Sequence, residues 1–325
     1  MSEKTIKEVV AALKEPAKKK FVELVQACFH SPELREKQAA ATAYEINTLS
    51  KAVRDNIDLP VVVKDGKVSI DTTDTEALIA RTTKRELLQS IHREQNIESI
   101  FAKTATQLES VEKCSSEPVN PDLLARFIEA GQDVSDDDLQ NLWAKILAGE
   151  IVKPKTCSLR TIDILKNMSK DEFDMFLKVC PFVMDDVIFS DSHLLLDKGI
   201  TTATILILDE CGLLIDTGLI RTVQLTGKEE KIFNTDKYIL LAKRRLPSMT
   251  SFFLTVYPLT ESGRKLYSLS DCNIDNTFFL AYSQFLVREH RDIEFRLHRI
   301  TNIETDGSIE YDKTVNLLNT PQETC

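Results

Sequence analysis

Glycine is scarce in this chain, with nine in 325 residues, or about 3% against an average of roughly 7%. Glycine is needed where the backbone must approach a bound phosphate closely. No P-loop, GxGxxG pattern or nucleophile elbow occurs in the sequence. The shortage therefore argues against a nucleotide-binding fold and favours a helix-rich framework without a cofactor.

Paired metal ligands and disulfide patterns are also missing. The seven cysteines include no CxxC pair, and the five histidines include no His-x-x-x-His pair. An odd cysteine count argues against a disulfide framework, and the spacing of a metal site is absent. We therefore expect no metal, no cofactor and no catalytic residue.

Long hydrophobic runs are absent too. The longest nearly apolar run, Ile205 to Ile215, is interrupted by Asp209 and Glu210 and is too short to span a bilayer. The first residues lead into a charged stretch and do not resemble a signal peptide. We expect a cytoplasmic protein with no membrane contact. The net charge of −10 disfavours DNA binding by bulk charge but allows a local basic patch.

Three consecutive helices are the best-marked part of the chain. Asn120 precedes a proline and predicts an N-cap, and Gly131 is expected to end that helix. Ser135 predicts the cap of a second helix, which we expect to end at Gly149. A capping box at Ser169 and Glu172 predicts the third, which Pro181 stops.

Large apolar residues follow helical spacing in the second and third of these helices. We expect them to form the core of a compact bundle over 120–181, with Leu159, Ile162 and Leu165 between them. The alternative for the only tryptophan is an exposed anchor for a partner. The predicted core residues are Leu139, Leu142, Trp143, Ile146, Leu147, Phe173 and Phe176.

The other patterns predict an α+β chain that is mainly α, with a helical N-terminal half. Three domains are expected: an N-terminal helical pair with a short extended connector over 1–73, a long helix plus the capped bundle over 74–184, and a winged-helix-like α+β domain over 185–325. Outside the capped bundle and the winged region, the expected helices cover 3–29, 33–55, 73–113 and 275–290, and the expected strands 59–63, 68–70, 293–297 and 309–311.

The winged-helix expectation depends on the order of elements after residue 200. A helix over 201–214 ends at a Cys-Gly-Leu-Leu step, and β-like segments follow at 219–225, 238–242 and 252–256. A Leu-Thr-x-x-Gly-x-x-Leu stretch at 259–266 then opens a short helix, as is common in such domains. This order predicts a winged helix-turn-helix.

The only basic cluster placed to contact nucleic acid is Lys243, Arg244 and Arg245. It would reach phosphate from the wing. The predicted recognition helix over 201–211, however, has no Arg, Lys, Asn or Gln to read base edges. A winged fold used for protein contacts is therefore favoured over one used for DNA.

Two acidic patterns suggest chemistry and have simpler explanations. Asp216 with Glu229 and Lys231 superficially matches a metal-dependent nuclease, but its polar surroundings indicate a hairpin tip. Asp136 to Asp138 suggest a cation site, but carboxylates in the first turn of a helix oppose its dipole. Both are interpreted as structural.

The segment from Gln132 to Ile151 closely resembles a bacterial family known only as a domain of unknown function, number twenty-eight-oh-six. Ser158 to Thr161, Ile164 to Ser169 and Arg93 to Ile100 fit the same pattern. The resemblance covers about residues 84–184, and the family has no established activity to transfer. A looser similarity to the helical module of abortive-infection alpha proteins implies a phage-defence or mobile-element setting.

These patterns together predict a non-enzymatic bacterial interaction or adaptor protein. Its partner is expected to be another protein or a further copy of the chain. The alternative, from another class, is a DNA-binding regulator that uses a winged helix over about 200–258.

Overall fold

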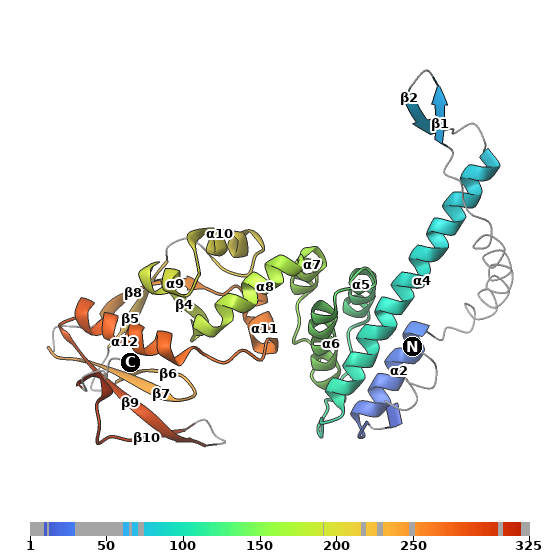
Figure 1. Ribbon diagram of the computed structural model, residues 1–325. Helices are drawn as coiled ribbons and strands as arrows, with labels where there is room; N and C mark the ends of the chain where they lie inside the picture. Colours follow the sequence, from blue (N-terminus) through green and yellow to red (C-terminus); the bar gives the residue numbers. More distant parts are fainter. Residues whose placement is uncertain are drawn as a thin grey trace. The chain divides into compact units, whose positions relative to one another are not determined.

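The structure is a computed structural model, drawn as a ribbon in Figure 1. It describes residues 10–11, 13–29, 61–64, 67–70, 75–190, 192–215, 219–225, 230–246, 251–304 and 308–319. The chain forms two compact units, Met1–Ile162 and Asp163–Cys325. The boundary between the units lies inside the segment 74–184 that was expected to be one domain, and the three-domain division stays a prediction.

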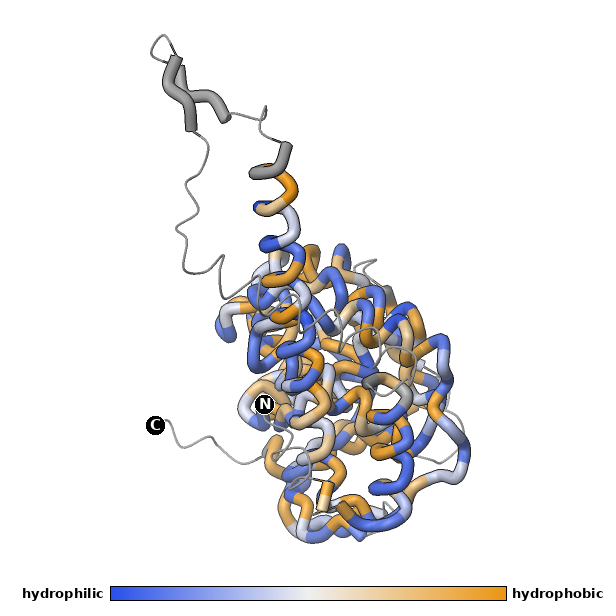
Figure 2. Tube along the Cα trace, turned by 90° about the vertical axis from the view of Figure 1, so that its right-hand side faces the viewer, coloured by the Kyte–Doolittle hydropathy of each residue, from blue (hydrophilic) through white to orange (hydrophobic). Residues whose placement is uncertain are grey.

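The described residues of the first unit are helical apart from loops and one small hairpin, in which β1 (Val61–Lys64) and β2 (Lys67–Ile70) pair antiparallel. Its longest element is α4 (Thr75–Leu108), and the C-terminal half of α4 packs along α6. Leu78, Ile79 and Ile91 in the N-terminal half are between 40% and 61% exposed, and Figure 2 shows this end of α4 beyond the other helices of the unit. Its other described helices include α2 (Ala17–Phe29), α5 (Pro121–Gly131), α6 (Asp137–Val152) and the start of α7 (Leu159–Asn167).

Trp143 lies at the centre of the first unit. Its side chain has no exposed surface and meets the ring of Phe127 edge-on, with centroids 4.9 Å apart. Gly131 lies against the indole ring of Trp143, since a Cβ at Gly131 would be 3.5 Å from the Trp143 side chain. The five apolar residues of α6 that were expected in the core are all buried, namely Leu139, Leu142, Trp143, Ile146 and Leu147.

The capping predictions for these helices are confirmed at two of three N-termini. Asn120 caps α5, and Ser169 with Glu172 forms the capping box of α8 (Lys170–Val179). The second cap was placed one residue early, because Asp136 and not Ser135 accepts the backbone N–H groups of Asp138 and Leu139. The predicted end at Gly149 is also wrong. The helix continues to Val152, which allows Ile151 to be fully buried.

In the second unit the described strands form two antiparallel sheets of four strands each, in the orders β3-β4-β8-β5 and β10-β9-β7-β6. The first sheet consists of β3 (Val183–Met184), β4 (Val187–Phe189), β8 (Ser251–Pro258) and β5 (Leu219–Gln224). The second consists of β10 (Ile309–Tyr311), β9 (Ile293–Ile303), β7 (Tyr238–Arg244) and β6 (Lys231–Asn234). The helical elements of the unit, in addition to α8, are η1 (Cys180–Phe182), α9 (Ser192–Asp197), α10 (Thr202–Glu210), α11 (Glu261–Leu269), α12 (Asn276–Glu289) and η2 (Leu317–Asn319).

Aromatic rings join the two sheets to α12. Phe189 of β4 stacks on Tyr282 of α12 at 4.4 Å and meets Phe233 of β6 edge-on at 6.2 Å. Phe252 of β8 packs edge-on against Phe295 of β9 at 5.8 Å. The strands β6 and β7, which lie between β5 and β8 in the sequence, belong to the second sheet. This sheet contacts the first one through the rings of Phe233 and Phe295.

The fold class predicted from the sequence, α+β and mainly α, is confirmed. The strands expected at 219–225, 238–242 and 252–256 are present, and so are the helices expected at 259–266 and 275–290. Residues 183–197, which contain β3, β4 and α9, were not assigned. The helix expected over 33–55 lies outside the described residues.

Phe173 and Phe176 of α8 are buried in the second unit. Ile162 and Leu165 are also buried, whereas Leu159 is 37% exposed, so its expected place in the core was wrong. Leu159 is the first residue of α7, where few helix neighbours surround a side chain. A single bundle over 120–181 stays a prediction. No helix in the described part of the chain has the length and apolar character to cross a membrane.

Trp143→Ala should destabilise the first unit by roughly 3–5 kcal/mol, the cost of emptying a large aromatic site in a packed core. Leu159→Ala is the matched control and should cost under about 1 kcal/mol, because Leu159 is partly exposed. Urea unfolding monitored by circular dichroism measures both. An unchanged midpoint for Trp143→Ala, with quencher-accessible tryptophan fluorescence in the wild type, would contradict the core assignment.

Candidate functional site

The sequence singled out three places: the segment 132–151, the predicted recognition helix and the basic cluster at 243–245. The first lies in the first unit and the other two in the second. Each is described from its own residues.

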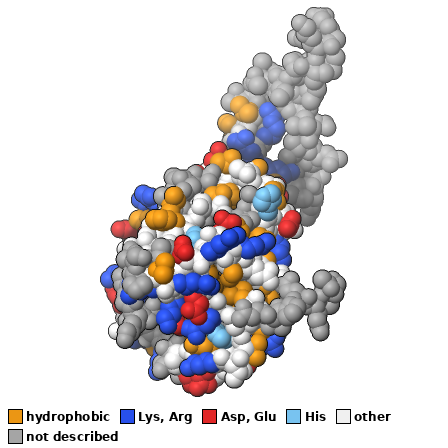
Figure 3. Space-filling model, turned by 90° about the vertical axis from the view of Figure 1, so that its left-hand side faces the viewer, with side chains coloured by type: hydrophobic (Ala, Val, Ile, Leu, Met, Phe, Trp, Pro, Cys, Tyr) orange, Lys and Arg blue, Asp and Glu red, His pale blue; other side chains and the backbone are white. Residues whose placement is uncertain are grey.

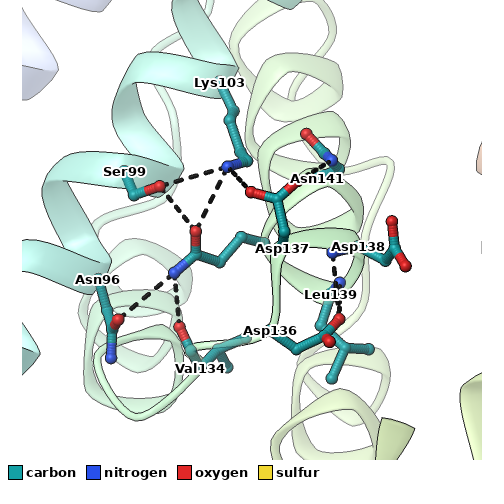
Figure 4. Close-up of polar contacts among 10 residues, drawn as sticks. Asn96, Ser99, Lys103, Val134, Asp136, Asp137, Asp138, Leu139 and Asn141 are labelled. Atoms are coloured by element: carbon teal, nitrogen blue, oxygen red, sulfur yellow. Dashed lines mark hydrogen bonds and ion pairs between the residues drawn. The ribbon is translucent and has the colours of Figure 1, made fainter.

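The segment 132–151 joins α6 to α4 through a polar seam, drawn in Figure 4. The Lys103 ammonium donates to Asp137 Oδ1 at 2.6 Å. The side-chain amide of Gln140, only 5% exposed, accepts from Ser99 Oγ at 2.7 Å and donates to the Val134 carbonyl at 2.8 Å. Every polar group of the buried amide is therefore satisfied within the protein.

The carboxylates of this segment act structurally. Asp136 caps α6, and Asp137 is held by Lys103, whose hydrogen bond and charge keep the pKa of Asp137 below its usual value. Within the described residues, no group of three or more His, Cys, Asp or Glu side chains could hold a metal ion. Asp136 to Asp138 thus have the helix-start role that their position predicted.

A buried carboxylate closes the other end of α6. Glu150 has no exposed surface and accepts from the backbone N–H groups of Lys155, Thr156 and Cys157 at 2.6–2.9 Å. Lys155 adopts a positive φ of 70°, so the chain turns sharply there. Four donors, counting the Thr156 hydroxyl, surround this carboxylate, and it serves as an internal cap for the loop after α6.

In the second unit, α10 presents its outer face to solvent. Ile205 and Leu208 are buried, while Thr202, Ala203, Asp209 and Glu210 are exposed and Leu206 is 48% exposed. This face contains one large apolar side chain and two carboxylates. It contains no cation, as the sequence indicated.

The position of α10 is set by the Leu-Thr-x-x-Gly stretch that follows β8. Thr260 donates its backbone N–H to the Leu213 carbonyl at 3.0 Å and its hydroxyl to the Gly212 carbonyl at 2.6 Å. Gly263 lies so close that a Cβ there would be 2.1 Å from the Leu213 carbonyl oxygen. The Cys-Gly-Leu-Leu step and the Leu-Thr-x-x-Gly stretch, two weak sequence signals, are thus in direct contact.

The N-terminus of α10 is tied down as well. Four residues connect α9 to α10, and Gly199 in this turn has a φ of +76°. The Lys198 ammonium in the same turn donates to Asp275 Oδ2 and to Thr277 Oγ1, both at 2.7 Å. Asp275 is the N-cap of α12, so the turn is fixed to the helix that fills the core of the unit.

The basic cluster lies at the end of β7. Lys243 and Arg245 are exposed, Arg244 is half-buried, and the Arg245 N–H donates to the Asp292 carbonyl at 3.2 Å. This contact brings the turn between α12 and β9 beside the cluster. Arg291 lies in that turn and Arg288 in the last turn of α12, and both are exposed. Sequence reasoning missed both arginines, because only the β7–β9 pairing brings residues so distant in sequence together.

We define the basic corner as Lys243, Arg244, Arg245, Arg288 and Arg291. Acidic side chains near these residues partly offset their positive charge. Glu289 and Asp292 are exposed in the same turn, and Glu294 pairs across the sheet with Lys243. Figure 3 shows lysine and arginine side chains gathered with acidic ones between them on one face of the molecule. The corner is therefore a mixed patch with an excess of positive charge.

The residues of the nuclease pattern are not assembled into a site among those described. Glu230 forms an ion pair with Arg296 of β9, and Lys231 is the exposed first residue of β6. Asp216 and Glu229 lie outside the described residues. His298 is buried against the Val315 carbonyl at 2.9 Å, which is a structural contact.

Residues 80–199 match the family described as "Protein of unknown function (DUF2806)". This confirms the suspected DUF2806 family. The DUF2806 match includes the C-terminal part of α4, the polar seam and the elements from α5 to α9. Neither the curated proteins nor the solved structures contain a match to the chain. The looser similarity to abortive-infection alpha proteins stays a prediction.

Gly263→Ala should destabilise the second unit by about 3 kcal/mol, because the new methyl group would overlap a backbone carbonyl that cannot move freely. Ser268→Ala on the exposed side of the same helix is the control and should change stability by under about 0.5 kcal/mol. Thermal melts of the full chain provide the measurement. Equal melting temperatures for the two variants would show that α11 can shift without cost.

Proposed function

We propose that this protein is a non-enzymatic bacterial interaction protein whose second unit contains a winged helix adapted to protein contacts. Support for the winged helix comes from the order of elements. The connection between α9 and α10 is a four-residue turn with a glycine at positive φ, as in helix-turn-helix pairs. The strand before this pair, β4, is hydrogen-bonded to β8, which pairs in turn with β5.

In this proposal, α10 is the helix at the recognition position and β5 with β8 is the wing hairpin. The connection between β5 and β8, where a short wing loop is usual, holds β6 and β7. The basic corner lies at the end of this inserted hairpin. The exposed face of α10, with Leu206 beside Asp209 and Glu210, is the observation that carries the proposal.

The charge of α10 favours a protein over DNA as its partner. A recognition helix in the major groove reads base edges with Arg, Lys, Asn or Gln and lies between two rows of phosphates. Two carboxylates on α10 would be repelled there, and Leu206 would have no hydrogen bond to offer. A protein surface with an apolar pocket and cations would accommodate the same face.

Capture of partners from the host, followed by mass spectrometry, tests the protein-contact proposal. We expect a partner to be retained by the wild type and to be absent with Leu206→Glu, whose melting temperature should be unchanged because Leu206 is largely exposed. Ile232→Glu, at a 49% exposed site on β6, is the matched control and should retain the partner. Retention of the same partner by Leu206→Glu, or enzymatic turnover that survives repurification, would refute the proposal.

The second candidate is a DNA-binding regulator, favoured by the cations of the basic corner. Phosphate contacts from this corner would not require α10 to read bases, and binding would be sensitive to salt but tolerant of sequence. The phage-defence setting implied by the looser family similarity is compatible with either candidate, and comparison of plaque formation with and without the gene would test it.

Fluorescence anisotropy with a random duplex at low and moderate salt separates the candidates. The interaction proposal expects no binding at low salt. If the second candidate holds, Arg288→Glu/Arg291→Glu should weaken binding and lower the salt slope by roughly one for each phosphate that the variant no longer neutralises. The triple change Lys243→Glu/Arg244→Glu/Arg245→Glu should abolish it. The matched control is Lys166→Glu/Lys178→Glu, which changes the net charge by the same amount as Arg288→Glu/Arg291→Glu. Both lysines are exposed and lie elsewhere in the second unit, so this variant should leave binding intact.

A further inference from the structure

Two cysteines of the second unit come together from distant parts of the sequence. Cys180 begins η1 at the end of α8, and Cys272 lies in the segment between α11 and α12, 92 positions later. The Asp275 N–H donates to the Pro181 carbonyl at 2.7 Å, so the two backbone segments are in direct contact. The side chain of Cys180 interacts with those of Cys272 and Ser270.

The surroundings of the two thiols differ in exposure. Cys180 has no exposed surface, whereas Cys272 is partly exposed. Ser270 Oγ donates to the Tyr267 carbonyl at 2.8 Å, and the Tyr267 hydroxyl donates to the Val183 carbonyl at 3.4 Å. These contacts hold the segment that carries Cys272 against η1 and β3. One thiol is therefore open to a small reagent, and the other is positioned behind it.

We propose that Cys180 and Cys272 form an oxidation-sensitive thiol pair that hydrogen peroxide closes to a disulfide. This proposal is independent of the partner of α10. The chemistry needs one oxidant molecule and two steps, and the partly exposed Cys272 reacts first.

In the first step, the Cys272 sulfur attacks one oxygen of peroxide and the O–O bond breaks. The products are a sulfenic acid on Cys272 and one water, which takes up the thiol proton. In the second step, the Cys180 sulfur attacks the Cys272 sulfur and the S–O bond breaks. The departing hydroxide leaves with the Cys180 proton as a second water, and peroxide has accepted two electrons from the two thiols.

The second step should depend on pH through the Cys180 thiol. Burial raises the pKa of Cys180, so its thiol is protonated at neutral pH. The thiolate is the better nucleophile, and its population rises as the pH increases. Disulfide formation should therefore be faster at pH 9 than at pH 7.

The test uses the full chain at low concentration, treated with stoichiometric peroxide and digested without reduction. Mass spectrometry should show a peptide pair joined through Cys180 and Cys272, lighter by two hydrogens and released by dithiothreitol. The melting temperature of the oxidised protein should rise by roughly 5–10 °C, because the crosslink constrains a long loop in the unfolded chain. Cys272→Ser should abolish both effects.

Cys211→Ser is the matched control, since Cys211 is also partly exposed in the same unit and burial raises its pKa to about 11. This variant should still form the crosslink. Cys180→Ala provides a second check, and in it Cys272 should stop at the sulfenic acid, which dimedone traps. Absence of the Cys180–Cys272 peptide from the oxidised wild type, or the same rise in melting temperature on oxidation of Cys272→Ser, overturns the proposal.

Discussion

The contact between Gly263 and the Leu213 carbonyl is the constraint on which the second unit depends. It brings the end of α10 against the start of α11, and the Thr260 hydrogen bonds to the Gly212 and Leu213 carbonyls direct the chain at the same place. Any side chain at position 263 would push these segments apart. The exposed face of α10 is therefore oriented by backbone contacts, which a surface substitution does not disturb.

In the first unit, buried polar groups fix the position of α4 relative to α6. The Gln140 amide is almost fully buried, and its partners come from α4 and from the turn before α6. A buried amide is tolerated only when its hydrogen bonds are satisfied, and this requirement selects one register between α4 and α6. The DUF2806 match covers these residues.

The two surfaces of the second unit differ in how they arise. The α10 face is made by one helix and can be inferred from nine consecutive residues. The basic corner needs β7, α12 and β9, and its excess of positive charge is partly offset by Glu289, Asp292 and Glu294. The Cys180–Cys272 pair likewise combines two segments, held by the hydrogen bond from Asp275 to Pro181.

Local signals in the sequence determined most of the described helices and strands, because caps, prolines and apolar periodicity act over a few residues. They located α5, α8, α10, α11 and α12 to within a few residues. They also showed that α10 has no cations. The β3–β4 hairpin was missed although Asp185 and Asp186, both at positive φ, form a two-residue turn of the kind that aspartate accepts. Only the tertiary structure decided the separation of the strands after β5 into two sheets, the place of Arg288 and Arg291, and the meeting of Cys180 with Cys272. Each of these depends on contacts between residues distant in sequence, whose free energies come from packing and hydrogen bonding that no short pattern records.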